Sequence, residues 1–102
     1  MTLLPTLKLR LAKPSALVDL GALSALKGIE VSGGTVTIKA MTRHADVMRS
    51  ADVAKAIPAL AQLAGGIGDV QVRHRGTIGG SVANNDPAAD YPSAVVALNA
   101  TI

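Results

Sequence analysis

HRGTIGGSVANNDPAAD, the stretch from His74 to Asp90, sets two adjacent glycines between hydroxyl residues and follows them with asparagine and aspartate. Within it, residues 76–81 are small residues that let a backbone approach another group closely. Adjacent glycines can adopt positive φ and present successive N–H groups on one concave side, which suits an anion such as a phosphate. The hydroxyls of Thr77 and Ser81 could add two hydrogen bonds, so the stretch is a candidate phosphate cradle.

The same glycines also fit a plain tight turn between two strands, because Gly-Gly pairs are common turn formers. No Gly-Lys-Ser/Thr ending is present, which excludes a Walker loop, and the GxGxxG spacing of dinucleotide-binding folds is absent. Arg73 or Arg75 could supply charge to a bound anion, yet Arg73–Arg75 could equally be a solvated turn. Spacing alone leaves both interpretations open.

Outward from this stretch, the clearest local structure is a β-hairpin. Residues 29–32 and 35–39 are rich in β-branched side chains and flank Gly33-Gly34, a two-residue turn typical of antiparallel strands. Further short extended segments are also expected, and in one of them, residues 70–73, apolar and polar residues alternate. The expected segments are residues 16–20, 70–73, 81–83 and 101–102.

Capping residues and prolines predict short helices in the rest of the chain. Near the start, the leucines also alternate with basic residues, so a strand is the alternative there. The expected helices are 4–11 with Pro5 in the first turn, 44–49 capped by Thr42, the turn capped by Ser50, 58–64 begun by Pro58 and stopped by Gly65-Gly66, and the second half of 87–98 with Asp86 as its cap. The expected fold is therefore α+β, a small and mainly antiparallel sheet with short helices packed against it.

The amino-acid composition limits which functions this chain can have. Of 102 residues, 49% are hydrophobic but only Tyr91 is aromatic, so the core must be aliphatic and Tyr91 is expected to be a structural plug. The absence of cysteine excludes disulfides and thiolate sites. No apolar run approaches the roughly 20 residues of a membrane span, and no secretory signal is recognisable. A cytoplasmic location is expected.

Charge and side-chain chemistry narrow the choice further. A net charge of +3 keeps nucleic acid in consideration, but without aromatic residues to stack on bases we expect no nucleic-acid partner. His44 and His74 have no acidic partners at metal-ligand spacing, so no metal site is expected. Neither Ser81 nor Ser93 has a base and an orienting acid, so no catalytic residue is expected. Asn84 and Asn85 suit either a ribose contact or capping of the following turn.

The longer segment Gly66–Leu98, GIGDVQVRHRGTIGGSVANNDPAADYPSAVVAL, closely resembles the FAD-binding subunit of molybdenum hydroxylases. That family includes the medium subunit of aerobic carbon monoxide dehydrogenase and the FAD domain of xanthine dehydrogenase. The segments LLPTLKLRLAKPSALVDLG, residues 3–21, and MTRHADV, residues 41–47, match the same pattern. The resemblance therefore covers essentially the whole chain.

The resemblance implies the second lobe of a vanillyl-alcohol-oxidase-like FAD-binding domain, in which two lobes clamp an extended FAD. Asp90 matches the acidic residue on the adenosine side of the cofactor, and Ile67 a position that lines the flavin or adenine pocket. The family often has Asn where this chain has Ser81, and both can hydrogen-bond. The residues that match its second pyrophosphate motif are Thr77, Ile78, Gly79, Gly80 and Ser81.

The resemblance also implies an oxidoreductase in which FAD takes electrons from the [2Fe-2S] clusters of an iron-sulfur subunit, itself supplied by a molybdopterin subunit. Met1–Pro5 begins where the family's first glycine loop has just ended, so residues 1–102 are expected to be a single partial domain without the first lobe and the C-terminal domain. Such a piece is expected to bind FAD weakly or not at all, to be inactive alone and to self-associate. The alternative is a non-catalytic anion-binding or assembly module.

Overall fold

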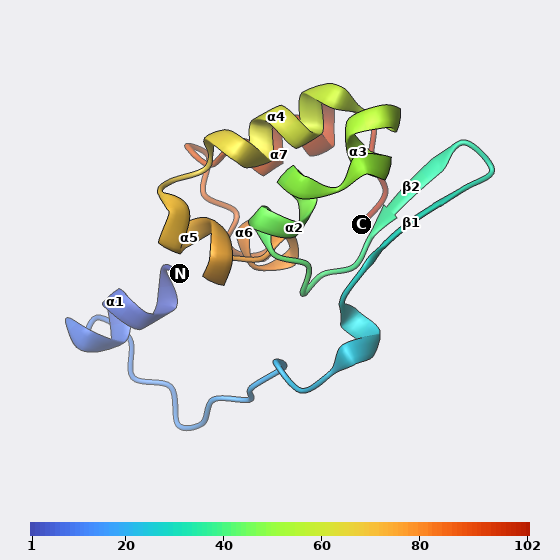
Figure 1. Ribbon diagram of the computed structural model, residues 1–102. Helices are drawn as coiled ribbons and strands as arrows, with labels where there is room; N and C mark the ends of the chain where they lie inside the picture. Colours follow the sequence, from blue (N-terminus) through green and yellow to red (C-terminus); the bar gives the residue numbers. More distant parts are fainter.

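A helical body made by residues 44–97 carries the core, and a hairpin and an N-terminal segment, residues 1–27, extend from it (Figure 1). The computed structural model describes all residues from 1 to 102. In chain order the elements are α1 (Leu3–Lys8), the 3₁₀ turn η1 (Ser24–Leu26), β1 (Ile29–Ser32), β2 (Thr35–Ile38), α2 (His44–Arg49), α3 (Ala51–Ala56), α4 (Pro58–Gly66), α5 (Val70–Arg75), α6 (Ile78–Asn84) and α7 (Asp90–Ala97).

The hairpin forms as the sequence predicts. β1 and β2 pair antiparallel from Ile29 opposite Ile38 to Ser32 opposite Thr35. The turn needs positive φ at both central positions, and Gly33 and Gly34 supply it with φ of 56° and 77°. The sheet consists of these two strands, so the α+β class is confirmed with helices contributing most of the structure.

The core lies where α2, α3 and α7 pack around α4 (Figure 1). Its buried members are aliphatic apart from one tyrosine, as the composition requires. Pro58 occupies the first turn of α4, and the Ser50 hydroxyl accepts the Val53 N–H at 3.2 Å to cap α3, so both predicted helix starts are confirmed. The buried cluster is Val47, Val53, Leu60, Ala61, Ala64 and Tyr91.

Outside the hairpin, all four predicted extended segments are wrong. Residues 70–73 belong to α5, because the Asp69 carboxylate accepts the Val72 N–H at 2.8 Å and starts a helix that the alternating valines concealed. Residues 81–83 lie inside α6, and residues 16–20 form no regular structure. At the C-terminus, 101–102 is not paired as a strand either.

Some predicted helix ends also differ. α4 continues through Gly65-Gly66, and a Cβ at position 65 would lie 3.4 Å from Met48 Cγ, so this glycine lets α4 pack closely on α2. Thr42 does not cap α2. Its hydroxyl instead accepts the Gly28 N–H at 3.1 Å and donates to the Gly28 carbonyl at 2.9 Å, which ties the base of the hairpin to the helical body.

Asn85 and Asp86 shape the turn that follows α6. Asn85 ends α6 in the left-handed conformation with φ of 50°, which supports the capping interpretation for this residue. The Asp86 carboxylate accepts the Ala88 N–H at 2.9 Å in a turn, while α7 begins only at Asp90, so Asp86 does not cap that helix. α7 covers most of the second half of 87–98, where a helix was expected, and begins earlier, at Asp90.

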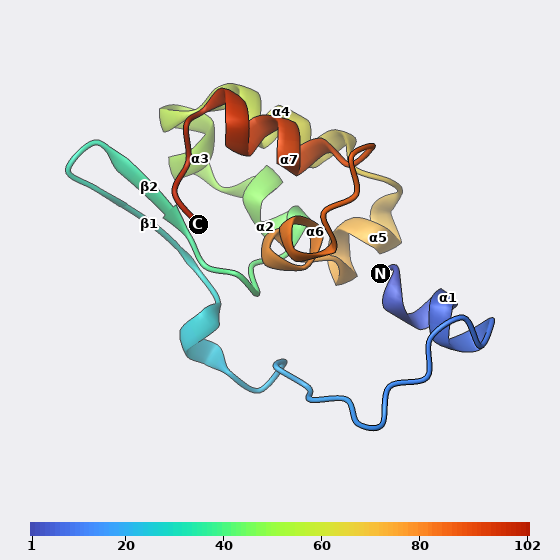
Figure 2. The ribbon, with the colours of Figure 1, turned by 180° about the vertical axis from the view of Figure 1, so that it is seen from behind.

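The two ends of the chain have different surroundings. The N-terminal segment contains the expected short helix α1 and otherwise runs along the outside of the molecule with mostly exposed side chains (Figure 1). From behind, α7 follows α4 and the C-terminal residues return beside β2 (Figure 2). None of the helices has the length and apolar character that crossing a membrane requires.

Candidate functional site

The Thr77 turn, residues 77–81, is the start of α6 rather than a loop. Thr77 occupies the N-cap position in an extended conformation, and its Oγ1 accepts the Gly80 N–H at 3.2 Å. Neither Gly79 nor Gly80 has positive φ, so the concave nest expected from the glycine pair is not formed. The site has the geometry of a capped helix N-terminus instead.

A second segment, residues 40–44, holds this turn in place. Thr77 and Arg43 form an isolated antiparallel bridge. Beside it, the Ile78 N–H donates to the Thr42 carbonyl at 3.0 Å and the Gly79 N–H to the Ala40 carbonyl at 2.9 Å. The N–H groups of residues 78, 79 and 80 therefore all have partners inside the protein, whereas the Thr77 N–H has none.

The glycines around the turn serve close packing. A Cβ at Gly79 would lie 2.6 Å from Ala40 Cβ and 2.7 Å from its carbonyl oxygen, and one at Gly76 would lie 2.5 Å from His44 Nε2. Gly80 is exposed, and the only atom that its Cβ would meet within 4 Å is Thr77 Oγ1, at 2.9 Å. Gly80 thus leaves one face of the turn open to a ligand.

A buried aromatic pair supports the turn from inside. The rings of His44 and Tyr91 lie 5.3 Å apart at 41°, and the His44 N–H donates to the Gly76 carbonyl at 3.1 Å. Both side chains are more than nine-tenths buried, and His44 Nδ1 and the Tyr91 hydroxyl have no hydrogen-bond partner. His44 is therefore structural, and Tyr91 is the expected plug.

Burial shapes the protonation of this pair. Desolvation lowers the pKa of His44, the Met1 amino group adds to this effect, and the Asp90 carboxylate opposes it. Desolvation also raises the pKa of the Tyr91 hydroxyl, again with a contribution from Asp90. At neutral pH both side chains are uncharged, so the support beneath the turn is a neutral pair.

The predicted site residues are only partly brought together. Asp90 is exposed at the start of α7, directly before Tyr91, and its charge is felt at His44 beneath the turn. Ile67 ends α4, packs against the core and is separated from Thr77 by α5 along the chain. The structure thus links the Thr77 turn to Asp90 through the aromatic pair.

The basic side chains near the turn differ in whether they have hydrogen-bond partners. Arg73 Nη1 donates to the carbonyls of Ile67 and Gly68 at 3.0 and 2.9 Å, so its guanidinium fastens the end of α4. His74 lies between the Val70 carbonyl and Arg49 Nη2, at 2.7 and 3.1 Å. Arg75 is exposed without a partner. Sequence reasoning missed Arg43, because only folding brings it beside Thr77.

The donors that remain fit an anionic diphosphate approaching from outside. They are the Thr77 N–H and the hydroxyls of Thr77 and Ser81, next to the bare surface of Gly80. The positive end of a helix macrodipole favours negative charge at the same place. This is a smaller donor set than a glycine nest provides, and it suits one side of a phosphate site.

Comparison with known proteins agrees with this chemistry. The family model described as "FAD binding domain in molybdopterin dehydrogenase" matches residues 1–102. The glyceraldehyde dehydrogenase medium chain of Sulfolobus acidocaldarius is 42% identical over 101 residues, 99% of this chain and 36% of the relative. The carbon monoxide dehydrogenase medium chain of Hydrogenophaga pseudoflava is 44% identical over 99 residues, 97% of this chain and 34% of the relative.

Solved structures show the same fold. Carbon monoxide dehydrogenase from Hydrogenophaga pseudoflava, in a form that lacks the Mo-pyranopterin moiety, matches with a TM-score of 0.91 and 46% identity over 94% of this chain and 33% of that one. Quinoline 2-oxidoreductase from Pseudomonas putida 86 matches with a TM-score of 0.86 and 41% identity over 89% and 32%. The chain thus spans about a third of the length of these relatives.

Proposed function

This chain belongs to the family of FAD-binding domains of molybdopterin dehydrogenases, as its resemblance indicated, and we propose that it holds the FAD diphosphate at the Thr77 turn. The observation that carries the proposal is the free Thr77 N–H beside two hydroxyls and the open face of Gly80. Ile78 and Gly79 hold the turn against residues 40–42. Asp90 contacts the adenosine side, and Ile67 lines the pocket farther along the cofactor.

FAD is the cofactor of the parent family, and the redox chemistry belongs to it. The protein part of the proposal is binding and orientation. We propose that the intact enzyme passes electrons from [2Fe-2S] clusters of an iron-sulfur subunit, supplied by a molybdopterin subunit, to FAD and on to an acceptor. A cytoplasmic location, which the cysteine-free composition favours, belongs to the same proposal.

Residues 1–102 contribute one side of the diphosphate site in this proposal, as a single partial domain that is inactive alone. Each hydrogen bond to a charged group contributes roughly 1.5–3 kcal/mol, and a tenfold change in affinity corresponds to about 1.4 kcal/mol. Loss of the several donors of the first lobe therefore weakens binding by orders of magnitude. We expect FAD to bind this chain weakly or not at all.

The test is a titration of this chain with FAD, followed by the amide signals of residues 77–81 in nuclear magnetic resonance. Thr77→Ala is expected to weaken binding at least fivefold, because it removes a donor at the turn. Thr37→Ala, which changes an exposed threonine of β2, is the matched control and is expected to bind as the unchanged chain does. Shifts confined to other regions of the chain would contradict the proposal.

A second candidate function has one observation in its favour. Three N–H groups of the turn are already bonded inside the protein, which is what a purely structural turn in an assembly module requires. In that case Thr77→Ala would lower the stability of the chain without changing the response to FAD. Measuring unfolding and FAD titration on the same variant separates the two functions.

Self-association belongs to the proposal as well. An apolar groove of about 870 Å³ runs between β2, α6 and α7, and Val96 and Ile102 are 81% and 89% exposed. Apolar surface of this kind favours association when no other part of the protein covers it. Light scattering over a concentration series should show a rising mass, and a constant monomer mass at high concentration would refute this expectation.

A further inference from the structure

Arg43 lies directly across from Thr77. The bridge between them is flanked by the hydrogen bonds from His44 N–H to Gly76 and from Ile78 N–H to Thr42, so the two residues form a non-hydrogen-bonded antiparallel pair. In such a pair both side chains project from the same face, with Cβ atoms roughly 4.5–5.5 Å apart. The Arg43 side chain therefore rises beside the Thr77 hydroxyl.

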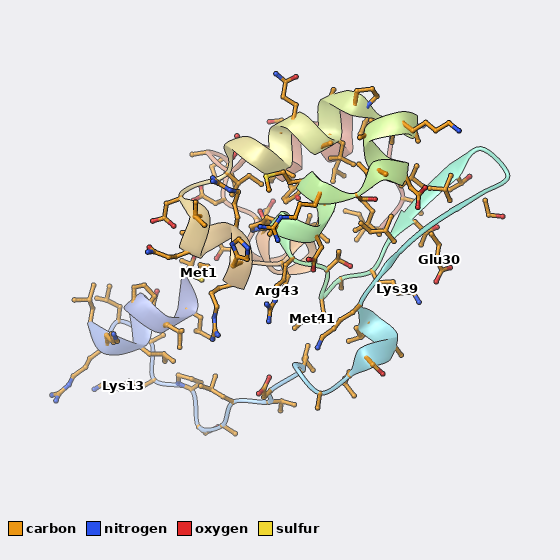
Figure 3. The ribbon with its side chains drawn as sticks, in the orientation of Figure 1. Met1, Lys13, Glu30, Lys39, Met41 and Arg43 are labelled. Atoms are coloured by element: carbon orange, nitrogen blue, oxygen red, sulfur yellow. The ribbon has the colours of Figure 1, made fainter.

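The guanidinium of Arg43 is free for a ligand. Arg43 is exposed, its guanidinium makes no hydrogen bond or ion pair, and the one salt bridge of the chain joins Lys39 to Glu30. Figure 3 shows Arg43 at the edge of the helical body that faces the N-terminal segment. Of the basic residues just before Thr77, Arg73 fastens the end of α4 and His74 pairs with Arg49, while Arg75 is exposed without a partner in the last turn of α5.

The positive charge at the pair comes from the Arg43 guanidinium. Arg43 is the N-cap of α2 and Thr77 the N-cap of α6, so two helices begin at the same bridge. Each helix is short and its end contributes little alone, but the guanidinium adds a full charge and a planar fork of donors that matches a phosphate. The acidic residue in the first turn of α2, Asp46, is exposed and forms no ion pair with Arg43.

We propose that Arg43 is a phosphate-binding residue, which grips the diphosphate of a dinucleotide from one side of the bridge while the Thr77 and Ser81 hydroxyls bind it from the other. This inference rests on the function proposed above and adds a residue to its site. The guanidinium supplies the positive charge that the turn itself lacks. The site then combines two chemically different kinds of donor, the charged planar guanidinium of Arg43 and the neutral hydroxyls of the Thr77 turn, beside the exposed Gly80.

The experiment compares Arg43→Gln, Arg43→Lys and the unchanged chain, each titrated with FAD and separately with inorganic pyrophosphate. Lys55→Gln, in the last turn of α3, removes one positive charge at another helix and is the matched control. Arg43→Gln is expected to weaken FAD binding about 10- to 100-fold at low salt, as loss of a charge-assisted hydrogen bond implies. Arg43→Lys should retain part of the affinity, and Lys55→Gln nearly all of it.

The outcomes separate the two claims. FAD binding that depends on Thr77 but is unchanged in Arg43→Gln overturns this inference and leaves the proposed function intact. Pyrophosphate that shifts the Thr77 and Gly80 amides only when Arg43 is present supports the inference, even if FAD does not bind and the proposed function fails. No response to either probe, or an equal loss in Lys55→Gln, overturns the inference.

Discussion

The two glycine pairs of this chain have opposite physical roles. Gly33-Gly34 sits at the hairpin tip with positive φ at both residues, and a Cβ on either would meet nothing within 4 Å. Gly79-Gly80 has ordinary helical torsions, yet a Cβ on Gly79 would penetrate Ala40. Backbone torsion requires the first pair, whereas in the second pair Gly79 is required by close contact between segments and Gly80 is exposed.

The difference explains why only the second pair belongs to the proposed binding site. The hairpin tip is surrounded by solvent and bonded only to its own strands, so it can change without disturbing the helical body. The Thr77 turn is tied to residues 40–44 on one face and open at Gly80 on the other. A binding surface needs such support, because donors must be held in place before a ligand arrives.

Gly79→Ala should disrupt the contact between Gly79 and Ala40 and have the largest effect on stability. The new methyl group would lie 2.6 Å from Ala40 Cβ and 2.7 Å from a backbone oxygen that cannot move alone. Overpacking of this kind lowers the free energy of unfolding by about 3 kcal/mol. Chemical denaturation checks it, and Ala40→Gly in the same chain should recover only part of the loss. A loss below about 1 kcal/mol would show that the two segments separate easily.

Gly34→Ala tests Gly33-Gly34, the pair that backbone torsion requires. No atom obstructs the methyl group, so the change acts through φ of 77° alone and should lower the free energy of unfolding by about 1–2 kcal/mol. Gly34→Asn should lower it less, since asparagine tolerates the left-handed conformation. Thermal unfolding measures both, and equal losses for alanine and asparagine would exclude a torsional cause.

The buried His44 should make the stability of the packed region depend on pH. Burial lowers the pKa of His44 below its unfolded value of about 6.5, so below that pH the unfolded chain binds more protons than the folded one. The stability contributed by neutral His44 is present above about pH 6.5 and is lost as the pH falls through the folded-state pKa. One proton limits the slope to about 1.4 kcal/mol per pH unit. Denaturation at several pH values should show a shallower slope for His44→Gln, and identical slopes would refute this origin.

Gly80→Ala should have the smallest effect on stability and still impair binding. Alanine improves helix propensity by about 1 kcal/mol, and its methyl group crowds Thr77 Oγ1 at 2.9 Å, so the net change should stay within about 0.5 kcal/mol. The methyl group also covers the open face of the turn, so FAD affinity should fall. A variant of unchanged stability that binds FAD as before would show that ligands do not approach over Gly80.

Local signals were reliable where the neighbours in sequence decide the structure. Gly33-Gly34, Ser50 and Pro58 act on residues within a few positions, and all three predictions are confirmed. Asp69 and Thr77 are also local caps, but valines in one case and glycines in the other concealed them. Gly65 was expected to stop a helix and instead gives Met48 room, which no local pattern reveals.

The sequence by itself determined the hairpin, most helix starts and the family, because turn torsions, caps and a long specific motif are written in adjacent residues. Only the tertiary structure decided what the Thr77 turn offers a ligand. Residues 40–44 take up two of its N–H groups and bring Arg43 beside Thr77. Hydrogen bonds between distant segments depend on how the whole chain packs, so residue spacing in the sequence does not predict them.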